Sequence, residues 1–312
     1  MPELSIIIPV YYNEETLEDV YSDLARTVFP AVPDYELVLV DDGSGDGSWG
    51  VMERLAERDK RVRLLRLSRN FGSHAAILAG LSVCGGNCAT VKTADCQEPA
   101  ELILDMYASW KRGSKVVLAV RTDREEGVFQ KAFANFYYWL VRKLAISSMP
   151  KGGFDCYLID RKVIEVLKLM DEANSALTLQ VLWAGFRRDT VYYVRKKREK
   201  GKSRWTLSKK IKLILDSLVS FSFVPIRMAT IAGMLFFCVA VVWGLVVLIS
   251  KLTNNIVTPG YTTLAIILLF SAGLILLILG ILGEYVWRAV EASRNRPVFI
   301  IDEEKGGEAG NR

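Results

Sequence analysis

The sequence predicts an α/β protein in which a doubly wound, mostly parallel sheet is followed by an amphipathic helix and a two-helix transmembrane hairpin. Three observations support this prediction. Residues 1–204 alternate short apolar runs with longer helical patterns, residues 205–224 are amphipathic at helical spacing, and two later 23-residue segments contain no charged side chain. About half of the residues are apolar while the formal net charge is +5, which suits a basic soluble face attached to a membrane.

The first domain, residues 1–204, contains five short runs rich in leucine and β-branched residues. The expected strands are residues 4–10, 36–40, 62–67, 89–92 and 116–120. Strands that alternate with helices indicate a largely parallel, doubly wound sheet. Ligands of such sheets bind beyond the carboxyl ends of the strands, so the residues that follow each strand are the candidates for chemistry.

Residues 205–227 form the expected juxtamembrane helix, which either lies in the membrane interface or packs its apolar side on a core. Met228–Ser250 and Tyr261–Gly283 can each span a bilayer core of about 30 Å, so residues 228–283 are the predicted hairpin. Lysines and arginines gather outside the hairpin. The positive-inside rule therefore predicts an integral protein of the inner or plasma membrane, with the first domain and a C-terminal tail, residues 284–312, in the cytosol.

The N-terminus and the cysteines agree with a cytosolic start. No basic segment precedes the first apolar run, which is too short for a signal peptide. The five cysteines are odd in number and scattered, which favours a reducing compartment over a disulfide framework. His74 is the single histidine, so a zinc site is not expected, and a structural role for His74 is favoured over a catalytic one.

Polar side chains follow the first two predicted strands. Asp42 lies in an Asp-Asp-Gly-Ser turn, where its carboxylate could accept hydrogen bonds from a nucleobase or ribose, and Tyr12 could pack against the base. A glycine and aspartate turn without any ligand explains the same residues. The strand ends therefore indicate a nucleotide site without requiring one.

The fourth predicted strand ends in a turn rich in oxygen ligands, which contains Asp95, Gln97 and Glu98. Hard divalent cations prefer such donors, and Mg²⁺ or Mn²⁺ would neutralise a nucleoside diphosphate leaving group. A capping turn before a helix that begins near Pro99 is the alternative. Both interpretations remain open at the level of the residues.

Seven features in order, spread over nearly the whole chain, resemble glycosyltransferase family 2 of the GT-A fold, and within it the polyprenyl-phosphate glycosyltransferases. They are Pro9–Glu15, Asp41–Ser44, Arg69–Gly72, Asp95–Glu101, Asp155, Arg198–Arg204 and Gly283–Tyr285. Each motif alone is weak, whereas their order and spacing together are specific.

The resemblance implies inverting transfer of a sugar from a nucleotide-diphosphate sugar to a membrane polyprenyl phosphate, with Mg²⁺ or Mn²⁺ as cofactor. It implies catalytic roles for Asp155 and Asp95, and metal ligation by Asp95 and Gln97. The implied nucleotide-sugar contacts are Pro9, Tyr12, Glu14, Asp42, Thr93, Ala94 and Arg121. The implied phosphate or acceptor contacts are Arg195, Arg198, Ser203 and Arg204, a basic run that would also attract anionic lipid.

Three positions depart from the family pattern. Thr93 stands where the family has an aspartate, so one carboxylate of the metal or phosphate side is missing. Tyr11 and Tyr12 shift Pro9 by one residue relative to the pattern, and Glu98 replaces an aspartate. We therefore expect a weaker or rearranged metal site.

Two other functions are compatible with parts of the sequence. A processive polysaccharide synthase would need a larger bundle of spans than two. A non-catalytic, membrane-tethered protein that binds a nucleotide sugar or a partner would explain Thr93. We expect a nucleotide sugar, a lipid phosphate and the membrane as partners, with no nucleic acid, and the family resemblance allows a homo-oligomer.

Overall fold

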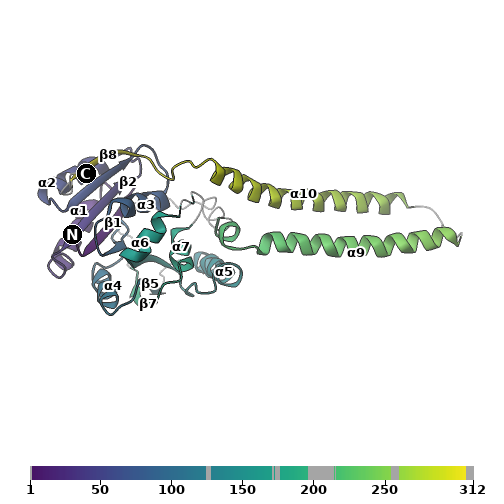
Figure 1. Cartoon of the computed structure of the whole chain (residues 1–312), viewed down its shortest axis with the longest axis horizontal. Helices are drawn as coiled ribbons and strands as arrows, with labels where there is room; N and C mark the ends of the chain where they lie inside the picture. Colours follow the sequence, from purple (N-terminus) through teal and green to yellow (C-terminus); the bar gives the residue numbers. More distant parts are fainter. Residues whose placement is uncertain are drawn as a thin grey trace. The chain divides into compact units, whose positions relative to one another are not determined.

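The computed structural model describes residues 2–123, 128–170, 172, 176–195, 214, 216–253 and 260–306. The chain divides into two compact units. Unit 1 comprises Met1–Ser217 and Pro297–Arg312, and unit 2 comprises Leu218–Arg296. The second unit is therefore inserted into the sequence of the first (Figure 1).

Unit 1 is built on an eight-stranded sheet in the order β7-β5-β6-β4-β1-β2-β3-β8. Its strands are β1 (Leu4–Val10), β2 (Tyr35–Asp41), β3 (Val62–Leu67), β4 (Cys88–Val91), β5 (Val116–Asp123), β6 (Phe154–Asp160), β7 (Arg188–Val194) and β8 (Ile301–Gly306). Only β6 and β8 run antiparallel to their neighbours. The predicted α/β fold with a mostly parallel sheet is confirmed, and the five predicted strands are β1 to β5.

Helices cover both faces of this sheet (Figure 1). The helices α1 (Leu17–Thr27), α2 (Ser48–Arg58) and α4 (Glu101–Lys111) share one apolar cluster with β1, whose residues Leu4, Ile6 and Ile8 are buried. The helices α3 (Ser73–Val83) and α6 (Arg161–Lys168) pack against β1 and β4 on the other face, and α7 (Leu177–Trp183) packs against α6. Burial on both faces explains why the central strands are nearly continuous apolar runs.

Glycine allows α3 to lie close to the sheet. A Cβ at Gly80 would come within 2.5 Å of Ile7 Cγ2 and 3.3 Å of Val40 Cγ2. The remaining helix of unit 1, α5 (Val128–Leu144), follows β5, and Tyr137 on it hydrogen-bonds Ser217 with 2.9 Å between the two hydroxyl oxygens.

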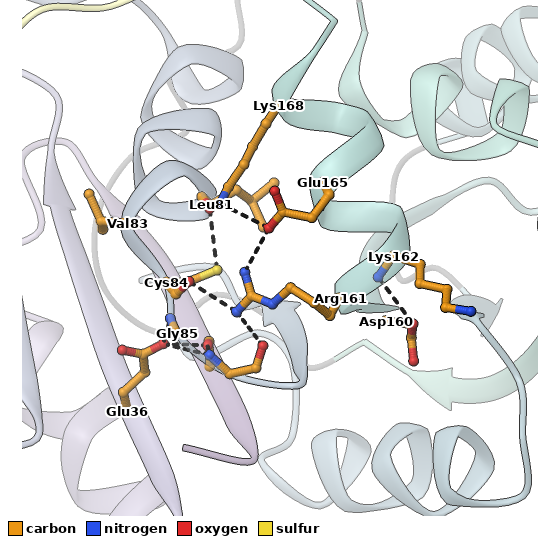
Figure 2. A network of polar contacts seen from close by, with 12 residues as sticks. Glu36, Leu81, Val83, Cys84, Gly85, Asp160, Arg161, Lys162, Glu165 and Lys168 are labelled. Atoms are coloured by element: carbon orange, nitrogen blue, oxygen red, sulfur yellow. Dashed lines mark hydrogen bonds and ion pairs between the residues drawn. The ribbon is translucent and has the colours of Figure 1, made fainter. Parts of the chain in front are cut away.

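A network around Arg161 holds the edge of the sheet where β6 ends and β4 begins (Figure 2). The Arg161 guanidinium donates to the carbonyl oxygens of Cys84, at 3.0 Å, and Gly86, and also donates to Glu165 at 3.2 Å. Glu36 accepts from the backbone amide of Gly86 at 3.1 Å. These contacts tie the loop before β4 to the start of α6, and therefore serve the fold.

Unit 2 consists of α9 (Val224–Leu252) and α10 (Tyr261–Ser293), which pack against each other. The rings of Phe236 and Phe270 meet with centroids 5.0 Å apart. Both helices are long and apolar enough to cross a membrane, and they carry many exposed apolar side chains. So much exposed apolar surface is unfavourable in water and suits contact with lipid.

The structure adds two details to the C-terminal part of the chain. The helix α10 begins at Tyr261, contains the predicted second span and continues beyond it to Ser293. Residues 301–306, expected to belong to a C-terminal tail, instead form β8 and join the sheet of unit 1 beside β3. The strand has the sequence Ile-Asp-Glu-Glu-Lys-Gly, which lacks the alternation of apolar and polar residues that predicts a strand. Its glutamates pair instead with arginines of β3.

Part of the predicted juxtamembrane helix lies outside the described residues, because residues 196–213 and 215 are not described. Residues 214 and 216–221 are helical. The implied acceptor residues Arg198, Ser203 and Arg204 also lie outside the described residues.

Candidate active site

The sheet topology brings the candidate residues to one edge. The strands β1, β2, β4, β5 and β7 point the same way, so their carboxyl ends share this edge, and antiparallel β6 begins there. The candidates at this edge are Pro9 in β1, Tyr12 after β1, Asp42 after β2, Thr93 to Gln97 after β4, Arg121 in β5, Asp155 in β6 and Arg195 after β7. Chain segments far apart in sequence thus form one polar rim.

The turn after β2 is held by its own carboxylates. The Asp41 Oδ1 atom accepts from the backbone amide of Ser44 at 3.0 Å. Asp42 is buried and accepts from the backbone amides of Phe71 and Gly72 at 2.7 and 2.9 Å. Burial raises the pKa of Asp42 to about 6. In this conformation Asp42 ties the turn to the loop before α3, so both of its oxygens already have partners.

Tyr12 and Glu14 lie against the same turn. The Tyr12 backbone has a φ of 57°, its amide donates to Ser44 Oγ at 3.0 Å, and its side chain is 40% exposed. Glu14 accepts from the backbone amide of Gly47 at 3.0 Å, at the N-terminus of α2. The Tyr12 ring is therefore accessible for stacking, whereas the Glu14 carboxylate is bound to the N-terminus of α2.

Pro9 is a β1 residue in register with Val40 of β2. The pairing of β1 with β4 ends at Ile7, so the missing amide of Pro9 breaks no ladder on that side. Ala94 is buried, and its carbonyl oxygen accepts from Thr16 Oγ1 at 2.5 Å.

Two carboxylates converge on the Thr93 hydroxyl. Its Oγ1 lies 2.7 Å from Asp95 Oδ1 and 2.6 Å from Glu98 Oε2. A hydroxyl has one proton, so it can donate to only one of the two carboxylates at a time. Glu98 is buried, and its Oε1 has no hydrogen-bond partner among the residues described. This side of the rim is rich in negative charge.

The same residues test the fit of a divalent cation. No group of three or more His, Cys, Asp or Glu side chains suited to a metal occurs among the described residues. Gln97 Oε1 accepts from the Arg195 guanidinium at 2.5 Å, which makes it a poor metal ligand in this conformation. The oxygen donors on this turn are Asp95, the Thr93 hydroxyl and Glu98, which are of the kind that Mg²⁺ prefers.

Arg121 and Asp155 form an ion pair across β5 and β6. The arginine side chain is 6% exposed, whereas the aspartate side chain is 40% exposed. The pair therefore presents a carboxylate at the surface of the rim, anchored by a buried cation. A buried cation without such a partner would be strongly unfavourable.

Two residues with clear structural roles in the rim were not singled out in the sequence. Ser44 bridges Asp41 and Tyr12, and a serine three residues after an aspartate in a glycine turn is the signal that could have indicated it. Lys92 is buried and its Nζ donates to the Glu98 carbonyl at 2.6 Å. A lysine at the end of a buried strand is the corresponding signal.

Burial lowers the pKa of His74 to about 4, so its ring is neutral at pH 7.

A mostly parallel α/β sheet with an acidic and arginine-rich rim at its carboxyl edge is the arrangement of a GT-A-type domain. The chain belongs to glycosyltransferase family 2 and is a glycosyltransferase. The model of that family, described as glycosyl transferase family 2, matches residues 5–156. The sequence resemblance to this family is thereby confirmed.

Two named relatives are similar over nearly their full length, and one solved structure is similar over a smaller part. The uncharacterized glycosyltransferase YkcC of Bacillus subtilis (strain 168) is 36% identical over 97% of this chain and 94% of its own length. The bactoprenol glucosyl transferase of Shigella phage SfV is 32% identical over 97% of this chain and 99% of its own length. Glucosyl-3-phosphoglycerate synthase from Mycobacterium tuberculosis, a solved structure, is 17% identical with a TM-score of 0.48, over 70% of this chain and 79% of that chain.

Proposed function

We propose that this glycosyltransferase moves a sugar from a nucleotide-diphosphate sugar to a membrane polyprenyl phosphate with inversion at the anomeric carbon. The observation that carries the proposal is the joint presence of the rim at the sheet edge and two membrane-length apolar helices in one chain. The name of the Shigella phage relative, a bactoprenol glucosyl transferase, supports the same acceptor class and suggests glucose as the first sugar to test.

In the proposed reaction, an oxygen of the lipid phosphate attacks the anomeric carbon while the bond to the nucleoside diphosphate breaks. The acceptor is already ionised, so Asp155 need not remove a proton. Because Asp155 is held by Arg121, we assign it to positioning of the acceptor or sugar. Rate acceleration would come mainly from alignment and from charge stabilisation.

The donor is assigned to the side of the rim with Tyr12 and the turn at residues 41–47. The accessible Tyr12 ring would stack on the base. Asp95, with the Thr93 hydroxyl and Glu98, would hold Mg²⁺ or Mn²⁺ against the diphosphate. The cation would neutralise the charge that develops on the leaving group. Arg195 donates to Gln97 in the turn after β4, so its guanidinium would also reach a phosphate oxygen bound at that turn.

A cavity beside β5 and β7 supports an anionic acceptor. Its volume is about 690 Å³, and its lining includes Arg121, Lys151 and Arg188. None of the described residues that line it is acidic. The cations in the lining attract a phosphate group, so the cavity offers the lipid phosphate a route toward the Arg121–Asp155 pair.

Membrane insertion completes the proposal. The helices α9 and α10 would cross the bilayer as a hairpin, because their apolar side chains are largely exposed. Lysines and arginines flank the hairpin on its outer sides, which supports a cytosolic position for unit 1. An enzyme anchored in this way meets a polyprenyl chain that cannot leave the bilayer at low cost.

The test is transfer by the purified full-length protein. It is incubated with polyprenyl phosphate, Mn²⁺ or Mg²⁺, and a panel of radiolabelled donors that begins with UDP-glucose and includes GDP-mannose. We expect labelled lipid with one donor, dependent on the acceptor, with inverted anomeric configuration by NMR. Absence of labelled lipid with every donor would refute the proposal and favour a tethered nucleotide-sugar binding protein.

A further inference from the structure

The C-terminal strand β8 contacts α2, which follows the donor turn at residues 41–47, and β3, which pairs with β2, the strand before that turn. On β3, Arg63 Nε donates to Glu304 at 2.8 Å, and Arg66 NH1 lies 3.9 Å from Glu303 Oε2. On α2, Glu53 Oε1 lies 2.7 Å from Lys305 Nζ. This strand thus reaches the surroundings of the turn from the far end of the chain.

Arg66 connects β8 to the turn itself. Its Nε lies 3.5 Å from Asp41 Oδ2, and its guanidinium carbon lies 5.2 Å from the centroid of the Trp49 ring. The other oxygen of Asp41 accepts from the Ser44 amide at 3.0 Å, and Ser44 Oγ accepts from the Tyr12 amide at 3.0 Å. A continuous series of polar contacts therefore runs from Glu303 to Tyr12.

The central contact of this series is the pairing of the Arg66 cation with the Asp41 carboxylate. The Asp41 side chain is fully buried, and a buried carboxylate requires a compensating cation. Within the described part of the chain, Arg66 is the cation paired with it. The Arg66 side chain is 37% exposed, so it can adopt other rotamers in water. A carboxylate at Glu303 favours the rotamer that faces Asp41, because it attracts the same guanidinium.

We propose that Arg66 and Glu303 are positioning residues of the donor site, which hold the turn at residues 41–47 and Tyr12 in the conformation that binds the nucleotide. The proposal rests on the proposed function in one respect, the assignment of the nucleotide to this turn. The strand β8 follows the apolar hairpin in the chain, so the donor site is complete only when the C-terminal segment has returned to the sheet.

The test compares two neighbouring carboxylates of β8 in the full-length protein in detergent. Glu303→Gln weakens the contact with Arg66 and the ion pair with Lys305, which keeps Glu53 as a partner. Glu304→Gln weakens the contact with Arg63 and leaves the Arg66–Asp41 pair in place. The first measurement is hydrogen exchange of the peptide that contains the Ser44 amide, without any ligand. The second is the donor KM and kcat, with the donor that gives labelled lipid.

We expect Glu303→Gln to speed exchange at residues 41–47 and to raise the donor KM by about two- to fivefold with kcat unchanged, the size expected for a partly exposed ion pair. Glu304→Gln should change neither quantity. Arg66→Ala should have the larger effect because it leaves the Asp41 carboxylate unpaired, and Arg66→Lys should restore part of the protection.

Equal exchange at residues 41–47 in the Glu303→Gln and Glu304→Gln proteins would overturn the proposal, since β8 would then contribute only general stability. Faster exchange in Glu303→Gln with an unchanged donor KM would also overturn it, because the turn would not position the donor. Failure of the proposed function looks different. In that case the wild type forms no labelled lipid, while the exchange comparison still decides whether Glu303 orders the turn.

Discussion

Arg121 and Asp155 are ion-paired between neighbouring strands, with the arginine buried and the aspartate partly exposed at the rim of the sheet. The pairing explains how an aspartate can project into a charged site and keep one orientation. It also means that removal of either charge leaves the other charge unbalanced.

The first prediction concerns this aspartate. Asp155→Asn should lower kcat by about a hundredfold or more, because a positioned charge at the reacting centre is lost while the side-chain shape is kept. Turnover is measured with labelled donor and polyprenyl phosphate, and folding by near-UV circular dichroism. Asp189→Asn is the control, since Asp189 lies in β7 and contacts Ser109 and Arg112. Equal activities of the two variants would show that Asp155 has no role in transfer.

The second prediction concerns the metal. In Thr93→Asp, a third carboxylate would lie beside Asp95 and Glu98, so Mn²⁺ should bind more tightly, by about tenfold, in the presence of nucleoside diphosphate. Electron paramagnetic resonance of free Mn²⁺ gives the affinity without reference to activity. Thr93→Ser, which keeps the hydroxyl, should titrate like the wild type. Identical midpoints for the aspartate variant and the wild type would contradict a cation at this turn.

The third prediction concerns pH. Burial raises the pKa of Asp42 from 3.8 to about 6, so the folded protein takes up a proton as the pH falls through about 6. Ionised Asp42 therefore lowers the stability of the fold above about pH 6, and this loss of stability is relieved as the pH falls from about 6 toward 3.8. Protonation also weakens the bonds from Phe71 and Gly72, so the donor KM should rise as the pH falls from 7 to 5. The Asp42→Asn protein should lack this dependence, and an unchanged pH profile in that variant would assign the titration to another group.

The fourth prediction concerns the glycine before Phe154 and Asp155. Gly153 has a φ of 64°, and a Cβ there would lie 2.0 Å from Tyr138 Cζ. Gly153→Ala should lower thermal stability through backbone strain of about 1 kcal/mol and a further overpacking cost of about 1–3 kcal/mol. Gly113→Ala is the matched control, because Gly113 has a φ of 100° with no atom within 4 Å of the added Cβ.

The stability of both glycine variants is measured by thermal unfolding in detergent. The kcat should fall only in Gly153→Ala, because the methyl group added there, two residues before Asp155, displaces Tyr138. An equal loss of stability in the two variants would mean that Tyr138 adjusts without strain. In that case the packing of α5 does not fix the start of β6.

The sequence predicted the parts of the molecule that depend on local composition. Residues 4–10 and 62–67 are strands because buried parallel strands need continuous apolar runs, and the two apolar helices are announced by their lack of charge. The strands β6, β7 and β8 were not predicted. In particular, the β8 sequence is mostly charged, and its pairing depends on arginines far away in the chain.

The candidate site divides in the same way. Sequence motifs indicated Asp42, Asp95, Asp155 and Arg121 one by one, because residues at strand ends share an edge in any parallel sheet. Their partners could not be deduced from the motifs, since the pairing of Gln97 with Arg195 depends on the distance across two intervening strands. The two hydrogen bonds that Asp42 accepts from backbone amides likewise depend on the position of the loop before α3 beside the turn after β2.

The sequence by itself determined the fold class, the family and the two apolar segments, because these follow from periodicity, hydrophobicity and motif order within short stretches. Only the tertiary structure decided that Arg121 holds Asp155, that Arg195 engages Gln97, and that the C-terminal strand approaches the donor turn through Arg66. The physical reason is that side-chain charges act through space over a few ångströms. Which charges meet is set by strand order and direction, and no local pattern encodes them.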